Sequence, residues 1–302
     1  MRGRFFLLLF LVILTPAHSW AEEFGTRRTH LDEEMRYGGY TLRVYQDLVP
    51  DKDGPTNFGE TLVVFRDGKE VYDFSDFRLE MRPKYVLSSH LWKPQEIIPL
   101  GTDITGDGQP NALIATYSGG AHCCYGYLIL ELGSEFREVT YFESRDFPVR
   151  FVDLDGEPGL EIVVWEGIFT YWKVSFAASP APLVFMKFRD GAYWPAPELM
   201  RAPPLTRAEL LRLARQIDVS EENPLWTPRL WGVMLNLIYS GNANQARDFF
   251  DLAWPPAAPG KEAFYDEFLN CQLRWSRYWS AIAEMNGFDP TAEPVGDCPG
   301  PQ

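Results

Sequence analysis

The 302-residue sequence has few cysteines, few basic residues and no long apolar segment after its first residues. Four cysteines in a chain of this length do not make a small disulfide-held scaffold, so any bridges would be local. No later stretch has 18 consecutive apolar residues, so no membrane span is expected. The 28 Lys and Arg stand against 42 Asp and Glu, a net charge of −14. Such an acidic chain repels phosphate backbones, which argues against nucleic acid as a partner.

The first residues have the pattern of a cleavable secretory signal. Two arginines precede an unbroken apolar run, residues 5–14, that falls short of the ~20 residues needed to cross a bilayer. Small residues at Ser19 and Ala21 stand where a signal peptidase cleaves. We therefore expect residues 1–21 to be removed and the protein to be exported, to the periplasm or the extracellular space. Cleavage removes two arginines and no acid, which would take the net charge to −16.

Residues from about 40 to 199 have the apolar alternation of short β-strands. Clusters of β-branched and aromatic residues recur, among them TLVVF, ALIATY, YLILEL, EIVVW, TYWKVSF and LVFMKF. Glycine-containing turn signals such as RDGK separate them, and no ten-residue helical stripe occurs among them. Short strands in hairpin succession predict an antiparallel β region.

After several prolines between residues 195 and 204, the apolar spacing becomes that of helices. Thr206 and Glu209 have the spacing of a capping box, which predicts a helix start. Three more helices are predicted: one with Pro228 at its first position, one capped by Asn242, and a long one over residues 264–286.

The predicted fold class is therefore α+β by segregation, an antiparallel β region followed by a C-terminal helical subdomain. The expected organisation is a signal peptide at residues 1–21, a β-rich domain at 22–200, the helical subdomain at 204–290 and a tail at 291–302.

Two acidic segments carry the most specific chemistry in the sequence. DITGDGQPNALI begins at Asp103, and DLDGEPGLEIV begins at Asp153; we call residues 103–111 the first loop and residues 153–161 the second loop. Oxygen-bearing side chains occupy positions 1, 3, 5 and 9 of both, namely Asp103, Thr105, Asp107, Asn111, Asp153, Asp155, Glu157 and Glu161. Calcium takes six to eight oxygens at ~2.3–2.6 Å, and alternate residues of a tightly curled loop can supply them.

This pattern, with the strand that follows it, resembles the FG-GAP or VCBS repeat, in which D-x-[DN]-x-D-G-x-x-[DE] precedes a strand of a β-propeller blade. The resemblance covers about residues 95–195 and does not extend to the helical part. It implies Ca²⁺ as a cofactor, the eight side chains above as ligands, and backbone carbonyls from Gln109 and Gly159. It also implies recognition work outside the cytoplasm. The β region, at about 160 residues, holds some three blades where closure usually needs four, so an incomplete propeller-like arrangement is expected.

The sequence departs from the family pattern at both loops. Thr105 replaces a carboxylate or amide in the first loop, and Pro158 replaces the turn glycine in the second. Glu157 is also one carbon longer than the aspartate of the pattern. The alternative to calcium sites is two Asx-rich turns that lead into their strands without a metal.

The cysteines are expected to form local bridges in an oxidising compartment. A bond between Cys271 and Cys298 would hold the proline- and glycine-rich tail and add roughly 3–4 kcal/mol in the chain-entropy model. Cys123 and Cys124 would then be bridged to each other or free, and the other two connectivities stay open. A vicinal bridge is strained, because neighbouring Cα atoms are only ~3.8 Å apart. A thiol-redox function for this pair is one hypothesis, although the C-x-x-C spacing is missing.

Two further functional hypotheses differ in class. The leading one is an exported, non-catalytic module, with calcium in its loops, that recognises a protein or a glycan. The other is an envelope hydrolase that cleaves glycans with a pair of carboxylates beside aromatic sugar platforms. The candidates for those roles are Asp155, Glu161 and Glu166 as acids, and Trp165 and Trp172 as platforms. The oligomeric state is not predicted.

Overall fold

The computed structural model describes residues 27–49, 56–81, 97–120, 124–217 and 226–294, together with Cys298. The expected signal peptide lies outside these residues. The chain divides into two compact units, Met1–Leu79 and Glu80–Gln302. None of the helices in the described ranges has the length and apolar character needed to cross a membrane. The predicted domain limits at residues 200 and 204 stay a prediction.

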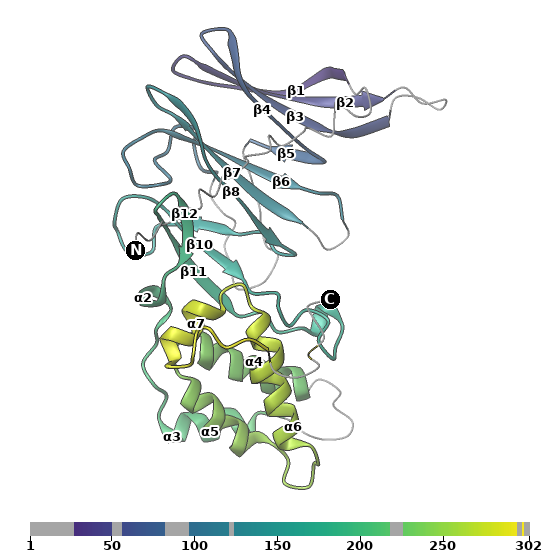
Figure 1. Cartoon of the computed structure of the whole chain (residues 1–302), viewed down its shortest axis with the longest axis vertical. Coiled ribbons are helices and arrows are strands. Elements are labelled where there is room, and N and C mark those ends of the chain that lie inside the picture. The colour runs from purple at the N-terminus through teal and green to yellow at the C-terminus, as the bar shows by residue number, and fades with distance from the viewer. Residues whose placement is uncertain are drawn as a thin grey trace, which may run out of the picture. The chain divides into compact units, whose positions relative to one another are not determined.

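The first unit contains a four-stranded antiparallel meander (Figure 1). Its strands, in sheet order, are β1 (Arg27–Tyr37), β2 (Tyr40–Val49), β3 (Thr56–Arg66) and β4 (Lys69–Asp76). The predicted RDGK turn joins β3 to β4. Asp67 and Gly68 have φ of 49° and 80°, the left-handed pair that a two-residue hairpin turn with the twist of its strands requires. On one face of the sheet Leu42 lies opposite Val64, and both are buried.

Two more four-stranded meanders follow, and the limit between the two units falls inside the first strand of the earlier one. The strands of the second sheet are β5 (Arg78–Glu80), β6 (Asn111–Tyr117), β7 (Tyr125–Leu132) and β8 (Phe136–Arg145). Those of the third are β9 (Arg150–Val152), β10 (Glu161–Trp165), β11 (Leu183–Arg189) and β12 (Ala192–Pro195). The antiparallel β region is thus confirmed, and in the described ranges none of the three sheets closes into a barrel.

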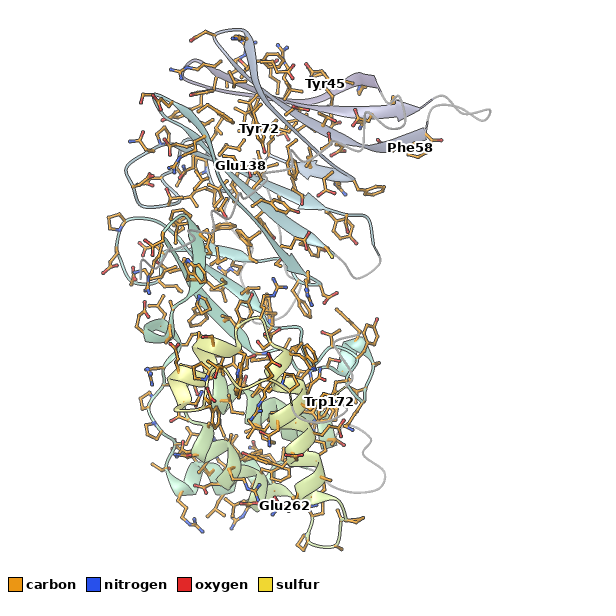
Figure 2. The ribbon with its side chains drawn as sticks, viewed as in Figure 1. Tyr45, Phe58, Tyr72, Glu138, Trp172 and Glu262 are labelled. Atoms are coloured by element: carbon orange, nitrogen blue, oxygen red, sulfur yellow. A yellow bond between two sulfur atoms is a disulfide. The ribbon has the colours of Figure 1, made fainter. Side chains whose placement is uncertain are left out.

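Residues 170–176, predicted as a strand, form turns and bends instead. Tyr171 and Lys173 have φ of 61° and 59°, in the left-handed region that an extended strand excludes. Between them, Trp172 packs against Trp231 of the helical segment, with ring centroids 4.7 Å apart (Figure 2). The aromatic residues that the alternation marked as a strand therefore serve as packing for the helices.

Six α-helices complete the described part of the second unit, and with the three sheets they confirm a mixed α+β fold. They are α2 (Pro197–Met200), α3 (Arg207–Arg215), α4 (Trp226–Tyr239), α5 (Ala243–Ala253), α6 (Lys261–Asp266) and α7 (Trp279–Asn286). The capping box is confirmed, since Thr206 accepts from the Glu209 N–H and Glu209 accepts from the Thr206 N–H. Asn242 precedes α5 as predicted, but its amide donates to the carbonyls of Ala202 and Ser240 instead of capping the helix.

The long helix predicted over residues 264–286 was wrong in its continuity. After α6 the chain forms a π-helical turn, Glu267–Cys271, and then a 3₁₀ turn, Gln272–Trp275. It becomes extended at Ser276, with φ −60° and ψ 131°, before α7 begins. The break brings the Ser276 hydroxyl onto the buried carboxylate of Glu166. The predicted end of the segment is confirmed, because Gly287 adopts the left-handed conformation that closes α7.

One hydrophobic core spans the sheets and helices of the second unit. It joins buried residues of the strands, such as Leu113 and Ile162, to residues of the helices, such as Trp231 and Phe250. The tail is held by the predicted disulfide between Cys271 and Cys298, whose Cα atoms are 5.6 Å apart. The two acidic loops lie at corresponding places in this unit, because each leads into the second strand of its sheet, β6 or β10.

Candidate functional site

The two acidic loops use the same hydrogen bonds at their first turn. The Asp103 carboxylate accepts the Gly106 N–H at 2.7 Å, and the Asp153 carboxylate accepts the Gly156 N–H at 2.7 Å. Each is an Asx-type turn, in which a short carboxylate replaces a backbone carbonyl. Gly106 and Gly156 have φ of 79° and 76°, which explains why glycine follows at this position in both segments.

The ninth residue of each loop closes it in the same way. Asn111 Oδ1 accepts the Ile104 N–H at 2.7 Å, and Glu161 Oε2 accepts the Leu154 N–H at 2.8 Å. Asn111 and Glu161 are buried and are the first residues of β6 and β10. The two loops thus share this pattern of hydrogen bonds and the position of their last residue in a sheet.

The two loops also touch each other through their backbones. The Leu160 N–H donates to the Ile104 carbonyl at 2.9 Å. A Cβ atom added to Gly106 would overlap the carbonyl oxygen of Pro158, and one added to Gly159 would lie 3.1 Å from the Gly106 nitrogen. Glycine is therefore needed at this contact for close approach as well as for its φ angle. The sequence predicted the loops separately and did not predict that they pack against each other.

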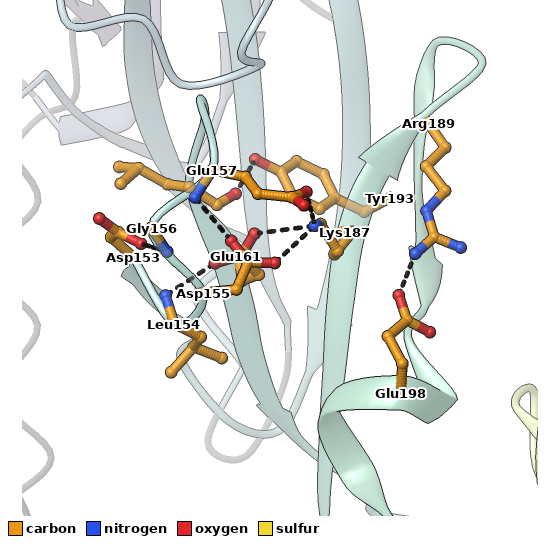
Figure 3. A network of polar contacts seen from close by, with 11 residues as sticks. Asp153, Leu154, Asp155, Gly156, Glu157, Glu161, Lys187, Arg189, Tyr193 and Glu198 are labelled. Atoms are coloured by element: carbon orange, nitrogen blue, oxygen red, sulfur yellow. Dashed lines mark hydrogen bonds and ion pairs between the residues drawn. The ribbon is translucent and has the colours of Figure 1, made fainter.

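The second loop surrounds the ammonium group of a lysine from the neighbouring strand. Lys187 of β11 places Nζ 2.5 Å from Asp155 Oδ2, 2.7 Å from Glu157 Oε2 and 4.0 Å from Glu161 Oε1 (Figure 3). Its side chain is 16% exposed. The hydrogen bond from Lys187 lowers the pKa of Asp155, and the hydrogen bonds to Asp155 and Glu157 raise the pKa of Lys187. A pair held in this way stays charged across the physiological range.

The carboxylates of the second loop are the acidic group in the described residues that could hold a metal ion. One oxygen from each of Asp153, Asp155 and Glu161 lies within 4.8 Å of the others. Oxygen ligands of this kind suit Ca²⁺. In their present arrangement, however, Asp155 and Glu161 face the Lys187 ammonium, and its positive charge repels a divalent cation at this distance. Calcium at this loop stays a prediction of the family resemblance.

The first loop has fewer oxygens to offer a cation. Both carboxylate oxygens of Asp103 accept backbone N–H groups, from Gly106 at 2.7 Å and Gly108 at 2.8 Å. The Asp107 carboxylate accepts the Gln109 N–H at 3.0 Å and lies 3.6 Å from the Arg137 guanidinium.

Asn111 limits the first loop further. Its Oδ1 is already used by the Ile104 N–H and by Thr105, and its buried Nδ2 has no partner within the described residues. An amide NH₂ donates and cannot coordinate a metal. Ligation by Thr105, Asn111 and the Gln109 carbonyl also stays a prediction.

Of the carboxylates proposed for glycan hydrolysis, Glu166 is not brought together with Glu161. Glu161 begins β10 and Glu166 follows its last residue, so five strand steps, about 16 Å, separate their backbones. Glycosidases place their two carboxyl groups about 5–9.5 Å apart. Asp155 does lie near Glu161, but the lysine that lowers its pKa disfavours the protonated form that a general acid needs. Trp172, proposed as a sugar platform, packs in the helical core.

Glu166 instead forms a buried polar network between β10 and the helices. Its carboxylate accepts the Ile168 N–H at 2.9 Å, the Ser276 hydroxyl, and the Tyr239 hydroxyl at 3.4 Å. Desolvation raises the pKa of Glu166, and the hydrogen bonds oppose that rise. Ser276 also accepts the Tyr278 N–H at 3.0 Å, so the network fixes the break before α7.

Of the predicted cysteine pairings, the one between Cys271 and Cys298 is confirmed. The vicinal pairing of Cys123 with Cys124 depends on Cys123, which lies outside the described residues, and so does His122 beside it. The backbone at the end of this hairpin is closed by Ser118, which donates its N–H to the Cys124 carbonyl at 3.0 Å. The redox hypothesis for the pair therefore stays a hypothesis.

A small pocket of about 240 Å³ opens between the second and third sheets and the segment before α7. Its walls are mostly apolar and aromatic, and Arg277 and Glu143 contribute the charged groups. The lining residues are Phe142, Glu143, Ser144, Ile162, Val164, Met186, Tyr193, Trp194, Pro195, Arg277 and Tyr278. The volume is below the ~300–1,000 Å³ of pockets that hold drug-sized ligands, so it suits one side chain or one ring.

Sequence reasoning missed Lys187, Arg277 and Trp194. Lys187 had a visible signal, because it is a single charge inside the apolar segment LVFMKF. Trp194 had no signal that separates it from the other nine tryptophans, and its side chain is 55% exposed. Arg277 had no signal, since its place beside β8 depends on the break at Ser276.

Comparison with known proteins found no matching protein family, no matching curated protein and no matching solved structure.

Proposed function

We propose that this chain is an exported, non-catalytic recognition module that binds a protein partner through the pocket beside Trp194. The pocket carries the proposal, because its lining combines aliphatic residues with Arg277 and with Trp194 of β12, whose exposed indole lies on the face of the sheet that Lys187 occupies. Trp, Tyr and Arg are the residues that most often dominate the binding energy of protein interfaces. The aliphatic floor, formed by Ile162, Val164 and Met186, favours an apolar side chain over a sugar, whose hydroxyls would lose their hydrogen bonds there.

Arg277 supplies a charge that the partner can pair with. Its guanidinium donates to the Glu143 carbonyl and lies 5.7 Å from the Tyr278 ring centroid, but it forms no ion pair within the described residues. Guanidinium groups bind carboxylates with two parallel hydrogen bonds. The preferred ligand is therefore a peptide in which an apolar residue lies next to Asp or Glu.

The FG-GAP or VCBS resemblance and the expected export are part of this proposal. The two equivalent acidic loops, each before the second strand of a four-stranded meander, support a repeated blade-like unit. The signal-like first 21 residues support export, and the disulfide between Cys271 and Cys298 is compatible with an oxidising compartment.

A displayed peptide library tests the proposal directly. The library is selected on the wild-type protein, and binding of enriched peptides is then measured on Trp194→Ala and Arg277→Gln. We expect an apolar residue beside an acidic one in the selected peptides, and a loss of affinity of about tenfold or more for each variant.

Trp275→Ala is the matched control, because Trp275 is also exposed, at 39%, and does not line the pocket. The Trp275→Ala variant should bind the selected peptides as the wild type does. All three variants should melt within about 2 °C of the wild type. Binding only to a glycan array, or peptides whose affinity is unchanged by Trp194→Ala, would contradict the proposal.

A further inference from the structure

Lys187 is placed as a cation would be in the second loop. Lys187 belongs to β11, which pairs with β10, so the positive charge comes from outside the loop. Its Nζ bonds to Asp155 and Glu157 and also lies 4.0 Å from Glu161 (Figure 3). These are three of the four side chains that the family resemblance implies as calcium ligands, and one ammonium group faces all of them.

The strand around Lys187 shows that its position is specific. On β11, Met186 and Phe188 flank it, and Met186 is buried in the core. Lysine is among the residues least often buried, and it is rarely so little exposed unless its charge is paired. The Lys187 side chain is only 16% exposed, so the carboxylates of the loop stabilise its charge, and its charge stabilises theirs.

The first loop supports the same reasoning by contrast. Within the described residues it has no lysine among its contacts, and at its ninth position Asn111 stands where the second loop has Glu161. Its two carboxylates are held by backbone N–H groups and by Arg137. Each loop thus has its negative charge matched by groups of the chain itself: the more acidic second loop receives an ammonium group and the less acidic first loop does not.

We propose that the Lys187 ammonium is the resident cation of the second loop and takes the place of the divalent ion that the family resemblance implies. The loop then keeps its shape whether or not calcium is present. The same arrangement makes a second consequence testable. Once the ammonium is removed, Asp153, Asp155 and Glu161 are left close together without compensation, and they form a site for a hard divalent cation.

The experiment measures thermal unfolding of the full chain with 10 mM CaCl₂ and with chelator, at matched ionic strength because salt screens exposed charges. The wild type should melt within 1 °C in the two conditions. Lys187→Met should melt lower than the wild type in chelator and gain about 3–5 °C in calcium, as expected for a site with a dissociation constant of ~1 mM. Equilibrium dialysis with calcium should show one additional bound ion per Lys187→Met molecule.

Lys173→Met is the matched control, because Lys173 pairs with the single carboxylate of Glu267 at 2.8 Å, away from the loops. It should show no calcium response. If Lys187→Met does not fold, Lys187→Gln replaces it, since its amide can still donate one hydrogen bond to Asp155.

Two results would overturn the proposal. One is calcium binding by the wild type at the second loop with an affinity similar to that of Lys187→Met. The other is a folded Lys187→Met or Lys187→Gln that takes up no more calcium than the wild type. Lys187 does not line the pocket, although it pairs with Trp194 across β11 and β12. The proposed peptide binding is therefore judged separately, on the Trp194 and Arg277 variants.

Discussion

Replacement of Glu166 tests the buried network that joins β10 to the helical segment. Desolvation raises the pKa of this carboxyl in the folded protein, whereas in the unfolded chain it has an ordinary pKa of about 4.3. Between those two values the folded protein holds a proton that the unfolded chain has lost. The stabilisation from this group is therefore complete below about pH 4.3 and is lost as the pH rises through the folded-state pKa.

The magnitude follows from the number of protons involved. The folded state holds one proton more than the unfolded chain inside that window. Each unit of rise in pH there therefore lowers the unfolding free energy by at most about 1.4 kcal/mol. For a unit of this size, that corresponds to a fall in Tm of about 3–6 °C per pH unit. Burial raises the pKa of Tyr239 and raises that of Tyr278 to about 12, so neither tyrosine titrates between pH 4.5 and 8.5.

Glu166→Gln removes the titration and keeps the shape. Its carbonyl can accept the Ile168 N–H, and its amide can donate to the Ser276 and Tyr239 hydroxyls, which can rotate to accept. The variant should match the wild type near pH 4.5 and exceed its stability at pH 7.5.

Glu166→Ala leaves the buried Ile168 N–H without its acceptor, at a cost of about 1–3 kcal/mol. Its destabilisation relative to the wild type should be larger at pH 4.5, because the wild type carries no desolvated charge there. Thermal unfolding followed by circular dichroism from pH 4.5 to 8.5 measures all three proteins. Parallel curves for the wild type and Glu166→Gln would show that Glu166 does not hold a proton in the folded state, and would refute this reasoning.

Two other predictions concern the tail and the contact between the loops. Cys298→Ser should lower the unfolding free energy by about 3.6 kcal/mol in urea, because the bond to Cys271 closes a loop with a sequence separation of 27; a loss below 1 kcal/mol would mean that the tail barely restricts the unfolded chain. Gly106→Ala should cost about 1–3 kcal/mol more than Gly108→Ala, since both glycines have positive φ but only the first meets the Pro158 carbonyl. Equal losses for the two glycine variants would contradict the back-to-back packing of the loops.

The sequence predicted the features that local chemistry decides. The capping box at Thr206, the RDGK turn and the glycine after α7 each depend on residues within a few positions, and all three are confirmed. The antiparallel strands were predicted from the alternation of apolar and polar residues, which is also a local property of the sequence. The disulfide between Cys271 and Cys298 was the favoured pairing because the tail has little else to hold it, and it is confirmed as well.

What the sequence could not supply depends on contacts between distant residues. Residues 170–176 have the apolar alternation of a strand, but they form turns and bends in which Trp172 packs against Trp231. The last helical segment has continuous apolar spacing, yet Ser276 leaves the helix to bind a carboxylate 110 positions earlier. Lys187 reaches the second loop only because β11 pairs with β10. In each case a tertiary contact outweighs a local preference.

The contact between the two acidic loops has a consequence for how the second unit folds. The Ile104 carbonyl receives the Leu160 N–H only when the loop before β10 is in place, although the strand that follows Ile104 belongs to another sheet. The first loop therefore gains this hydrogen bond only once the second loop has formed. Contacts between residues this far apart in the sequence slow folding, and we expect the second and third sheets to fold together as one unit.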